Sequence, residues 1–350
     1  MYRSVRAMLI GVLAATTLVS GCGSPAAPSQ TTSPATSGAE GSPSAAPSAP
    51  ATQEVEVGPH KLPGTLRRPD GKRRPIAVLL VWGSGPHDRD STIGKAGNKG
   101  FKDIAEGLAA EGITSLRFDK RSKAHPELFT DEYTLEDEYF EDVDAALKLL
   151  QGEPDLAQAK LFVAGHSQGG MVLPEILKRH TDVAGGISLA GTPRSLFDII
   201  ADQQVAAIDA MQIDEKQKQE RTKLARQTAE LAKKIDSPED TVPLQLTGMS
   251  ASYIASLNAL DAAGTAQQLH TPMLFLQGEE DQQVFPDPDF AEWKRLLQGQ
   301  EGVEFRSYPG LNHFFWTSQG LPPLEDLDAP AHVSSEVIQD MAEWMHRTAG

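Results

Sequence analysis

Short apolar runs alternate with amphipathic segments along the chain from residue 76 onward, and this alternation constrains the fold more than any other feature. Each run is long enough for one buried strand, which typically has about four to eight residues. The runs lie at 76–81, 113–118, 160–165, 185–190, 272–277 and 303–308. Segments with helical spacing of apolar residues lie at 101–111, 138–150, 170–179, 290–298 and 333–349. Strands that alternate with helices predict an α/β fold with a mainly parallel central sheet flanked by helices.

Two further segments extend this pattern. A hairpin at 54–57 and 61–67 is predicted to precede the first run. A long segment at about 195–265 interrupts the rhythm, because it is rich in Ala, Gln, Lys and Glu and its apolar residues recur at helical spacing. We therefore predict one domain at 53–350 that carries a helical cap insert at about 195–265.

The charge and the cysteine count exclude several classes of protein. The chain has a formal net charge of −16, whereas non-specific binding to nucleic acid needs Lys and Arg side chains that replace phosphate counterions. Its single cysteine, Cys22, excludes zinc sites built from several thiolates. Asp287 and Asp289 flank a proline, but two carboxylates on one loop are a weak metal signal, and we predict a solvated loop there. We expect no metal, no organic cofactor and no nucleic-acid partner.

The N-terminal segment has the features of an export signal. Arg3 and Arg6 precede an apolar stretch at 7–19, which matches the hydrophobic region of a signal peptide and is shorter than the roughly 20 residues of a transmembrane helix. The segment ends Leu18-Val-Ser-Gly-Cys22. This ending resembles the lipobox of bacterial lipoproteins, which implies a signal peptide at 1–21 and a lipid on Cys22. An ordinary secretory signal with an incidental cysteine is the alternative.

Residues 22–52 are mostly Ser, Pro, Ala, Thr and Gly. Such a segment buries too little apolar area to offset the entropy that it would lose on ordering. We therefore predict a disordered tether between the lipid and the domain. The resemblance to lipoproteins implies that the protein is anchored to the cell membrane and faces outside the cytoplasm.

The pentapeptide Gly165-His-Ser-Gln-Gly169 connects the predicted strand at 160–165 to the predicted helix at 170–179. A Gly-x-Ser-x-Gly sequence in this context places the serine on a tight strand-to-helix turn, whose crowding favours glycine on both sides. The positive end of the helix would then lie beneath an oxyanion that forms beside the serine. Ser167 is therefore the candidate nucleophile of a serine hydrolase.

A serine nucleophile needs a base, and an acid that orients this base, further along the chain. Asp281 follows the run at 272–277, with Glu279 and Glu280 as rivals for the acid. His313 follows the run at 303–308. The order Ser, Asp, His is the one that this arrangement of strands requires.

These motifs resemble those of the α/β-hydrolase superfamily over about residues 54–349. The superfamily commonly carries Gly-x-x-Asp-x-x-Val and Gly-x-x-His after the strands that supply the acid and the base, and Asp281 and His313 occupy the matching positions. The resemblance implies that Ser167, Asp281 and His313 form a catalytic triad and that no cofactor takes part. A bacterial subgroup also has Arg-Tyr-Asp-Lys-Arg-Gly, which here is Arg117-Phe-Asp-Lys-Arg-Ser122.

The loop after the first run has the sequence Gly83-Ser-Gly-Pro-His-Asp-Arg-Asp90. It is similar to the same subgroup of bacterial α/β-hydrolases and esterases. The resemblance implies an oxyanion hole formed by the backbone N–H groups of Gln168 and Ser84, with Gly85 as the alternative to Ser84. The three charged residues that end this loop are expected to brace it through salt bridges.

The other histidines have weaker claims on the chemistry. His166 neighbours the nucleophile and His87 lies in the loop after the first run, so each is a weak candidate for contact with the substrate. His332 and His346 lie beside or on the predicted last helix, and both are expected at the surface.

The motifs favour a serine hydrolase that cleaves small-molecule acyl esters through an acyl-enzyme intermediate, in the manner of a carboxylesterase. A serine peptidase is the alternative, because the same scaffold serves amide cleavage. An acyl or peroxide-forming transferase would carry the same triad. A non-catalytic binding lipoprotein is disfavoured, since a degenerate scaffold would tolerate loss of the serine, the acid, the histidine or the glycines, and all are present in order.

Overall fold

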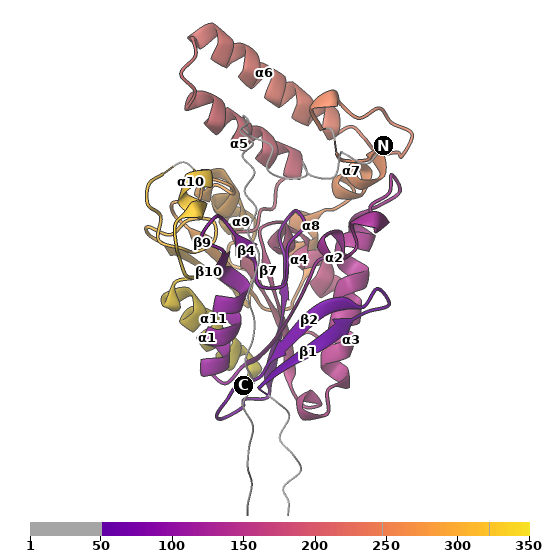
Figure 1. Ribbon diagram of the computed structural model, residues 1–350, viewed down its shortest axis with the longest axis vertical. Coiled ribbons are helices and arrows are strands. Elements are labelled where there is room, and N and C mark those ends of the chain that lie inside the picture. The colour runs from indigo at the N-terminus through magenta and orange to yellow at the C-terminus, as the bar shows by residue number, and fades with distance from the viewer. Residues whose placement is uncertain (1–50, 247, 322) are drawn as a thin grey trace, which may run out of the picture.

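The computed structural model describes residues 51–246, 248–321 and 323–350. Its centre is an eight-stranded sheet in the order β1-β2-β6-β3-β7-β8-β9-β10 (Figure 1). The strands are β1 (Thr52–Val57), β2 (Leu62–Arg67), β3 (Ile76–Val81), β6 (Thr114–Phe118), β7 (Lys160–His166), β8 (Gly185–Leu189), β9 (Met273–Gly278) and β10 (Val303–Tyr308). The strands from β6 to β10 in this order run parallel, whereas β1 and β2 form an antiparallel hairpin at one edge. The predicted α/β fold is confirmed.

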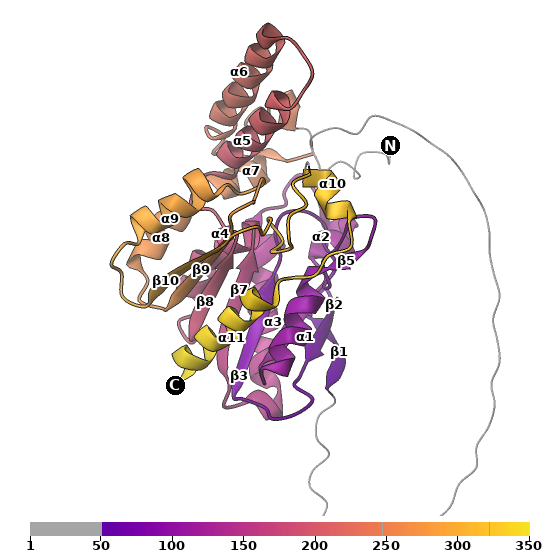
Figure 2. The ribbon, with the colours of Figure 1, turned by 90° about the vertical axis from the view of Figure 1, so that its left-hand side faces the viewer.

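The parallel strands are covered on both faces, which explains why the sequence shows continuous apolar runs and not an alternation. Every residue of β3 and β9 is buried, whereas exposed and half-buried residues alternate along most of the edge strand β1. The sheet packs against its helices through two clusters of buried hydrophobic side chains. One cluster involves α1 (Gly100–Ala110) and α11 (Ser335–Ala349), and the other involves α3 (Glu141–Gly152), α4 (Gln168–Arg179), α8 (Ala262–Gln268) and α9 (Ala291–Leu296) (Figure 2).

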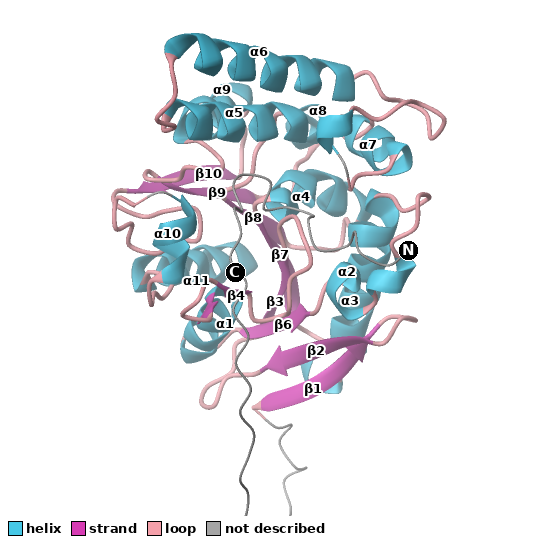
Figure 3. Cartoon of the chain, turned by 45° about the horizontal axis from the view of Figure 1, so that its top comes forward, coloured by secondary structure: helices cyan, strands magenta, loops and turns pink. Residues whose placement is uncertain are grey.

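Between β8 and β9 the chain leaves the sheet and forms α5 (Leu196–Asp209), α6 (Glu215–Ala232) and α7 (Ala251–Asn258). Helices α5 and α6 lie side by side beyond the carboxyl ends of the strands (Figures 1 and 3). Small buried residues, among them Ala225, Ala229 and Ala232, lie on α6 and allow a close approach. Helix α8 packs on α4, so it belongs to the layer that flanks the sheet even though the predicted cap ends inside it.

The remaining elements are short. They are β4 (Thr92–Ile93), β5 (Asn98–Lys99), α2 (Arg121–Ala124), η2 (Pro126–Leu128), η3 (Glu136–Phe140), η4 (Pro154–Leu156), η5 (Leu244–Leu246), η6 (Pro286–Phe290) and α10 (Pro323–Asp328). Helix α4 begins at Gln168, two residues before the predicted start, and Pro174 lies in its second turn. A proline there removes one backbone N–H from the helical ladder.

Within the described ranges, no helix combines the length and the apolar character that are needed to cross a bilayer. The predicted signal peptide and Cys22 lie outside the described residues. Strand β1 begins at Thr52, one residue before the predicted start of the domain.

Candidate active site

Ser167 lies at a sharp turn between β7 and α4, with φ of 55° and ψ of −118°. A non-glycine residue in such a region costs about 1–3 kcal/mol and persists only where the surroundings hold it. Here the backbone N–H of Ser167 donates to the carbonyl oxygen of Leu189 at 2.8 Å. A Cβ on Gly165 would lie 2.2 Å from the carbonyl oxygen of Gly169. The crowded turn therefore requires glycine at 165 and presents a strained serine at the start of a helix.

Asp281 and His313 form a buried pair. Nδ1 of His313 lies 2.8 Å from Oδ2 of Asp281, and the two side chains are 5% and 0% exposed. Oδ1 of Asp281 accepts the backbone N–H groups of Gln283 and Val284, and Oδ2 also accepts Nε2 of Gln277 at 2.9 Å. Hydrogen-bond donors on both oxygens therefore fix the Asp281 carboxylate. The carboxylate accepts the hydrogen bond of the Nδ1–H group of His313, so that Nε2 can accept a proton.

The rivals of this pair lie elsewhere. Glu279 and Glu280 are exposed, and Glu279 accepts a hydrogen bond from the hydroxyl of Ser307. His332 is exposed and contacts Asp103. His346 is half-buried, and its ring lies 3.1 Å from the carbonyl oxygen of Glu111. None of these side chains reaches the Asp281–His313 pair.

His166 connects the pair to the turn that carries Ser167. Its Nε2 lies 2.9 Å from the carbonyl oxygen of His313, and the two rings are 4.7 Å apart between centroids. Burial, together with the nearby His313, lowers the pKa of His166 well below its ordinary range. His166 is therefore neutral and donates a hydrogen bond to the backbone carbonyl of His313, which stabilises the position of His313. His166 does not line the pocket described below.

The loop after β3 passes directly over Ser167. A Cβ on Gly83 would lie 2.9 Å from Cβ of Ser167 and 3.4 Å from its Oγ, so only glycine fits without a shift. In the described part of the chain, the backbone N–H groups of Ser84 and Gln168 donate to no other group. Both are thus available beside Ser167, and so is the N–H of Gly85.

His87 holds this loop from within. Its Nε2 lies 2.7 Å from the carbonyl oxygen of Ser84, and its ring stacks on Trp82. Burial lowers the pKa of His87 to about 4, and the charge of Lys120 acts in the same direction. The ring is therefore neutral near pH 7 and donates through Nε2, and His87 is also absent from the wall of the pocket.

The charged residues at the end of the loop brace it, as expected, and the salt bridges of Arg89 and Asp90 are made to partners outside the loop. Arg89 pairs with Glu54 at 2.9 Å, and Asp90 pairs with Arg117 at 3.0 Å. Asp88 accepts the backbone N–H groups of residues 90 and 92. The loop is thereby attached to β1 and β6 and to its own following turn.

A pocket of about 40 Å³ adjoins the turn. Its wall includes Gly85 and Gln168 beside apolar side chains from two regions, Phe129 near α2 and Leu196 and Met249 of the insert. Ser167 and His313 do not line it. The pocket thus begins next to the candidate oxyanion donors and extends beneath the insert.

Four residues of this region are not identified by the sequence patterns: Lys120, Glu138, Tyr139 and Tyr253. They form a buried polar cluster in which Nζ of Lys120 lies 2.7 Å from a Glu138 oxygen. Lys120 belongs to the Arg117–Ser122 motif, which is the one signal in the sequence that points to this cluster. Glu138 and Tyr253 are 115 positions apart, so no local pattern connects them.

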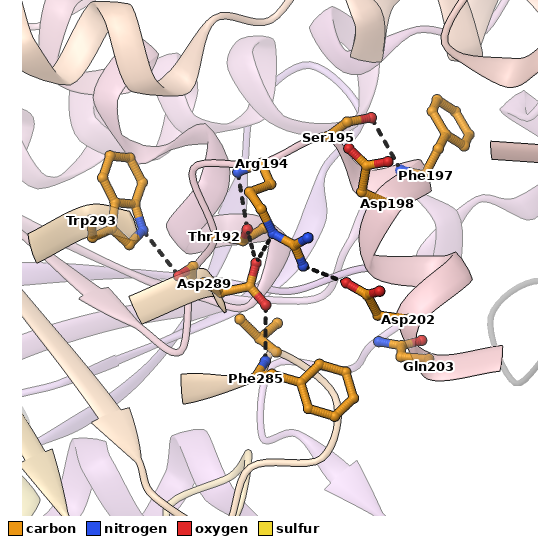
Figure 4. Close-up of polar contacts among 12 residues, drawn as sticks. Thr192, Arg194, Ser195, Phe197, Asp198, Asp202, Gln203, Phe285, Asp289 and Trp293 are labelled. Atoms are coloured by element: carbon orange, nitrogen blue, oxygen red, sulfur yellow. Dashed lines mark hydrogen bonds and ion pairs between the residues drawn. The ribbon is translucent and has the colours of Figure 1, made fainter. Parts of the chain in front are cut away.

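One expectation from the sequence is wrong. Asp287 is exposed, but Asp289 is completely buried and does not lie in a solvated loop. Its carboxylate accepts the hydroxyl of Thr192 and Nε of Arg194, both at 2.7 Å, and the N–H of Phe285 at 3.0 Å (Figure 4). Arg194 also pairs with Asp202 of α5 at 2.6 Å. This cluster connects the insert to the segment that follows Asp281.

No group of three or more His, Cys, Asp or Glu side chains in the described residues is arranged to hold a metal ion.

Comparisons with known proteins show the family of the chain. Residues 98–318 match the family described as serine aminopeptidase, S33. Esterase EstD of Thermotoga maritima is 33% identical over 296 residues, which cover 84% of this chain and 67% of that protein.

Two solved structures share the fold at low sequence identity. The Pyrococcus furiosus esterase Pf2001 matches with a TM-score of 0.53 and 16% identity, over 85% of this chain and 91% of that one. Est1E from Butyrivibrio proteoclasticus matches with a TM-score of 0.53 and 14% identity, over 85% of this chain and 99% of that one. The chain therefore belongs to the serine aminopeptidase S33 family of the α/β-hydrolase superfamily, and it is a hydrolase.

Proposed function

We propose that the protein is a serine ester hydrolase whose nucleophile is Ser167. The observation that carries this proposal is the buried 2.8 Å contact between His313 and Asp281, which His166 connects to the strained turn at Ser167. The similarity to Esterase EstD supports an ester substrate over an amide. No other pair of a histidine and a carboxylate in the described residues is as deeply buried.

In the first half of the reaction, Oγ of Ser167 attacks the acyl carbonyl carbon while its proton passes to Nε2 of His313. Asp281 accepts the Nδ1–H of His313 and stabilises the imidazolium that forms. The N–H groups of Ser84 and Gln168 donate to the oxyanion. When the tetrahedral intermediate collapses, the alcohol leaves with the proton of His313 and the acyl group stays on Ser167.

In the second half, His313 removes a proton from water as the water attacks the acyl-Ser167 carbonyl carbon. The same two N–H groups hold the second oxyanion. Collapse returns the proton to Oγ of Ser167 and releases the carboxylic acid. No step needs a group other than the chain, the ester and water.

The pocket beneath the insert is the proposed acyl site. Its wall includes the apolar side chains of Phe129, Leu196 and Met249, which suit a hydrocarbon chain, and its small volume favours short acyl groups. The predicted helical cap at about 195–265 supplies Leu196 and Met249, so the insert would determine acyl preference. The substrate is a small-molecule ester.

Hydrolysis of p-nitrophenyl acyl esters by the purified protein tests the proposal. Ser167→Ala is expected to lower kcat/KM by at least about 10³-fold, since removal of the nucleophile leaves only the contribution of the oxyanion hole and binding. Ser307→Ala changes an exposed serine on β10 and should match the wild type. Turnover by Ser167→Ala close to that of the wild type refutes the assignment.

A serine peptidase is the second candidate, because the family that matches residues 98–318 is described as a serine aminopeptidase. The triad and the oxyanion donors would be the same, and the scissile bond would be an amide. Aminoacyl p-nitroanilides in the same assay separate the two. A higher kcat/KM for the nitroanilides than for the esters would replace the ester proposal.

We also propose that a lipid on Cys22 anchors the protein to the cell membrane, with the domain outside the cytoplasm. The proposal rests on the lipobox-like ending of the apolar N-terminal segment. Cys22→Ser should release the protein from the membrane fraction into the medium or the periplasm. Equal partition of the variant and the wild type into membranes contradicts the anchor.

A further inference from the structure

A buried chain of hydrogen bonds joins the two backbone segments that carry the proposed oxyanion donors. It runs from the Gly83–Ser84 peptide through Lys120, Glu138 and Tyr253 to the side chain of Gln168. These four side chains are 6% exposed or less. They come from the segment after β6, from η3, from α7 of the insert and from the start of α4.

At one end, the chain holds the peptide before Ser84. The carbonyl oxygen of Gly83 accepts Nζ of Lys120 at 2.8 Å and the hydroxyl of Tyr139 at 2.9 Å. In a trans peptide the carbonyl oxygen and the next N–H point in opposite directions. Two donors on the Gly83 carbonyl therefore fix the direction of the Ser84 N–H, beside Ser167.

Lys120 has no donor left for another role. An ammonium has three N–H donors, and its acceptors are the Gly83 carbonyl oxygen, the Tyr139 hydroxyl at 3.1 Å and Glu138 at 2.7 Å. Burial lowers the pKa of Lys120, and the charge of Glu138 opposes this effect. Its three partners therefore hold Nζ of Lys120 in a fixed, buried position at the Gly83 carbonyl oxygen.

At the other end, the chain holds the residue after the nucleophile. The hydroxyl of Tyr253 makes a short contact to the second oxygen of Glu138, and it accepts Nε2 of Gln168 at 3.0 Å. A tyrosine hydroxyl has one proton, which Tyr253 donates to Glu138. Gln168 therefore donates to Tyr253, which fixes the side chain of the residue that follows the nucleophile.

We propose that Lys120, Tyr139, Glu138 and Tyr253 are positioning residues that align the N–H groups of Ser84 and Gln168 for the oxyanion, and that the insert takes part in the chemical step through Tyr253. This inference rests on the proposed serine mechanism. It gives α7 a role besides lining the acyl pocket, because Tyr253 connects Glu138 to Gln168.

The physical reason is preorganisation. An oxyanion donor contributes to the rate only if it already points at the position that the oxyanion will occupy, and removal of a whole donor costs about 10²–10³-fold in kcat. Removal of a positioning hydroxyl leaves the donor in place but loosens it, so a smaller effect is expected. We expect kcat to fall and KM to stay nearly unchanged, because the two N–H groups bind the carbonyl oxygen of the substrate more weakly than the oxyanion of the transition state.

The test uses the full chain and two isosteric variants, Tyr253→Phe and Tyr139→Phe, each of which removes one hydroxyl. Lys120→Met is unsuitable, because it would leave Glu138 buried without a counterion and destabilise the fold. Tyr308→Phe is the matched control, since its buried side chain donates to Asp340 on α11, away from the loop after β3. Steady-state hydrolysis of p-nitrophenyl acetate gives kcat and KM, and an arylboronic acid, which forms a tetrahedral adduct with the serine, reports on the oxyanion hole.

Both variants at the site are expected to lose about 5- to 50-fold in kcat, within the limit set by loss of a whole donor. KM should change by less than about twofold, and boronate affinity should fall by a factor close to that in kcat. Tyr308→Phe should retain both values. Thermal unfolding of all three variants near the wild-type temperature shows that the loss in kcat does not reflect misfolding.

An active wild type whose Tyr253→Phe and Tyr139→Phe variants keep wild-type kcat and boronate affinity overturns the inference alone. The inference also fails if the variants lose only thermal stability, or if the loss appears only in KM. A folded wild type that neither hydrolyses the ester nor binds the boronate overturns the proposed function, and the inference with it.

Discussion

The hydrogen bonds of Asp281 make Asp281→Asn the most informative substitution near the active site. Four donors converge on this carboxylate: two backbone N–H groups on Oδ1, and Gln277 and His313 on Oδ2. An asparagine amide has one oxygen and one NH₂ group. If the amide oxygen serves the two backbone N–H groups, the NH₂ group faces Nδ1 of His313.

His313 then has to accept through Nδ1 and carry its proton on Nε2. That is the nitrogen that must take the proton of Ser167, so the base is lost while the geometry is kept. In a well-studied serine protease triad this tautomer change lowers kcat by about 10⁴-fold, which corresponds to about 5 kcal/mol of transition-state stabilisation. We expect a kcat loss of about 10³- to 10⁴-fold in Asp281→Asn, with KM little changed.

Steady-state hydrolysis of p-nitrophenyl acetate near neutral pH measures the effect, with circular dichroism as the check that the variant is folded. Glu280→Gln is the control, because Glu280 is the exposed neighbour that competes for the role in the sequence. It should keep wild-type kcat. A folded Asp281→Asn variant within about tenfold of the wild type would refute the reasoning, as would an inactive Glu280→Gln variant.

Two further predictions follow from the polar contacts. Arg194→Met leaves the fully buried Asp289 without its counterion, so the free energy of unfolding in urea should fall by about 3–5 kcal/mol. Arg226 is the control, because its half-exposed side chain pairs with Asp202, and Arg226→Met should lower the free energy of unfolding by less than about 1 kcal/mol. Equal losses in the two variants would contradict this prediction. The pKa of His87 lies at about 4 in the folded protein and at its ordinary 6.5 in the unfolded chain. Between these two pH values the unfolded chain binds a proton that the folded protein does not bind. The free energy of unfolding therefore falls as the pH drops from 6.5 to about 4, by up to about 3 kcal/mol. His87→Gln should therefore flatten this part of the pH dependence of urea unfolding, and an unchanged slope between those two pKa values would show that His87 does not cause it.

Much of the architecture could be predicted because its physical causes are local. Parallel strands that are buried on both faces appear as continuous apolar runs, and the runs at 76–81 and 303–308 coincide with β3 and β10. The turn at Ser167 follows from two glycines and a strand that precedes a helix. Asp281 and His313 can be placed from chain order, since each follows a parallel strand and such strands end at the same edge of the sheet.

The rest depends on contacts between distant positions. Asp289 resembles a loop residue because it follows a proline, yet its charge is balanced by Arg194, which lies 95 positions earlier. The cluster around Lys120 likewise joins segments whose polar residues look like ordinary surface residues in the sequence. Such pairings form only after the sheet has brought the segments together. Hydrophobic periodicity and turn residues in the sequence therefore cannot predict these pairings.

Covalent labelling by a fluorophosphonate tests the central claim most directly, because the reagent reacts much faster with a serine that a base has activated than with an ordinary serine hydroxyl. Intact-protein mass spectrometry of the labelled wild type, followed by peptide mapping, gives both the stoichiometry and the site. We expect one adduct per chain on Ser167, and no adduct on Ser167→Ala. An adduct on a different residue, or no adduct on folded wild-type protein, would contradict the assignment of Ser167 as the nucleophile.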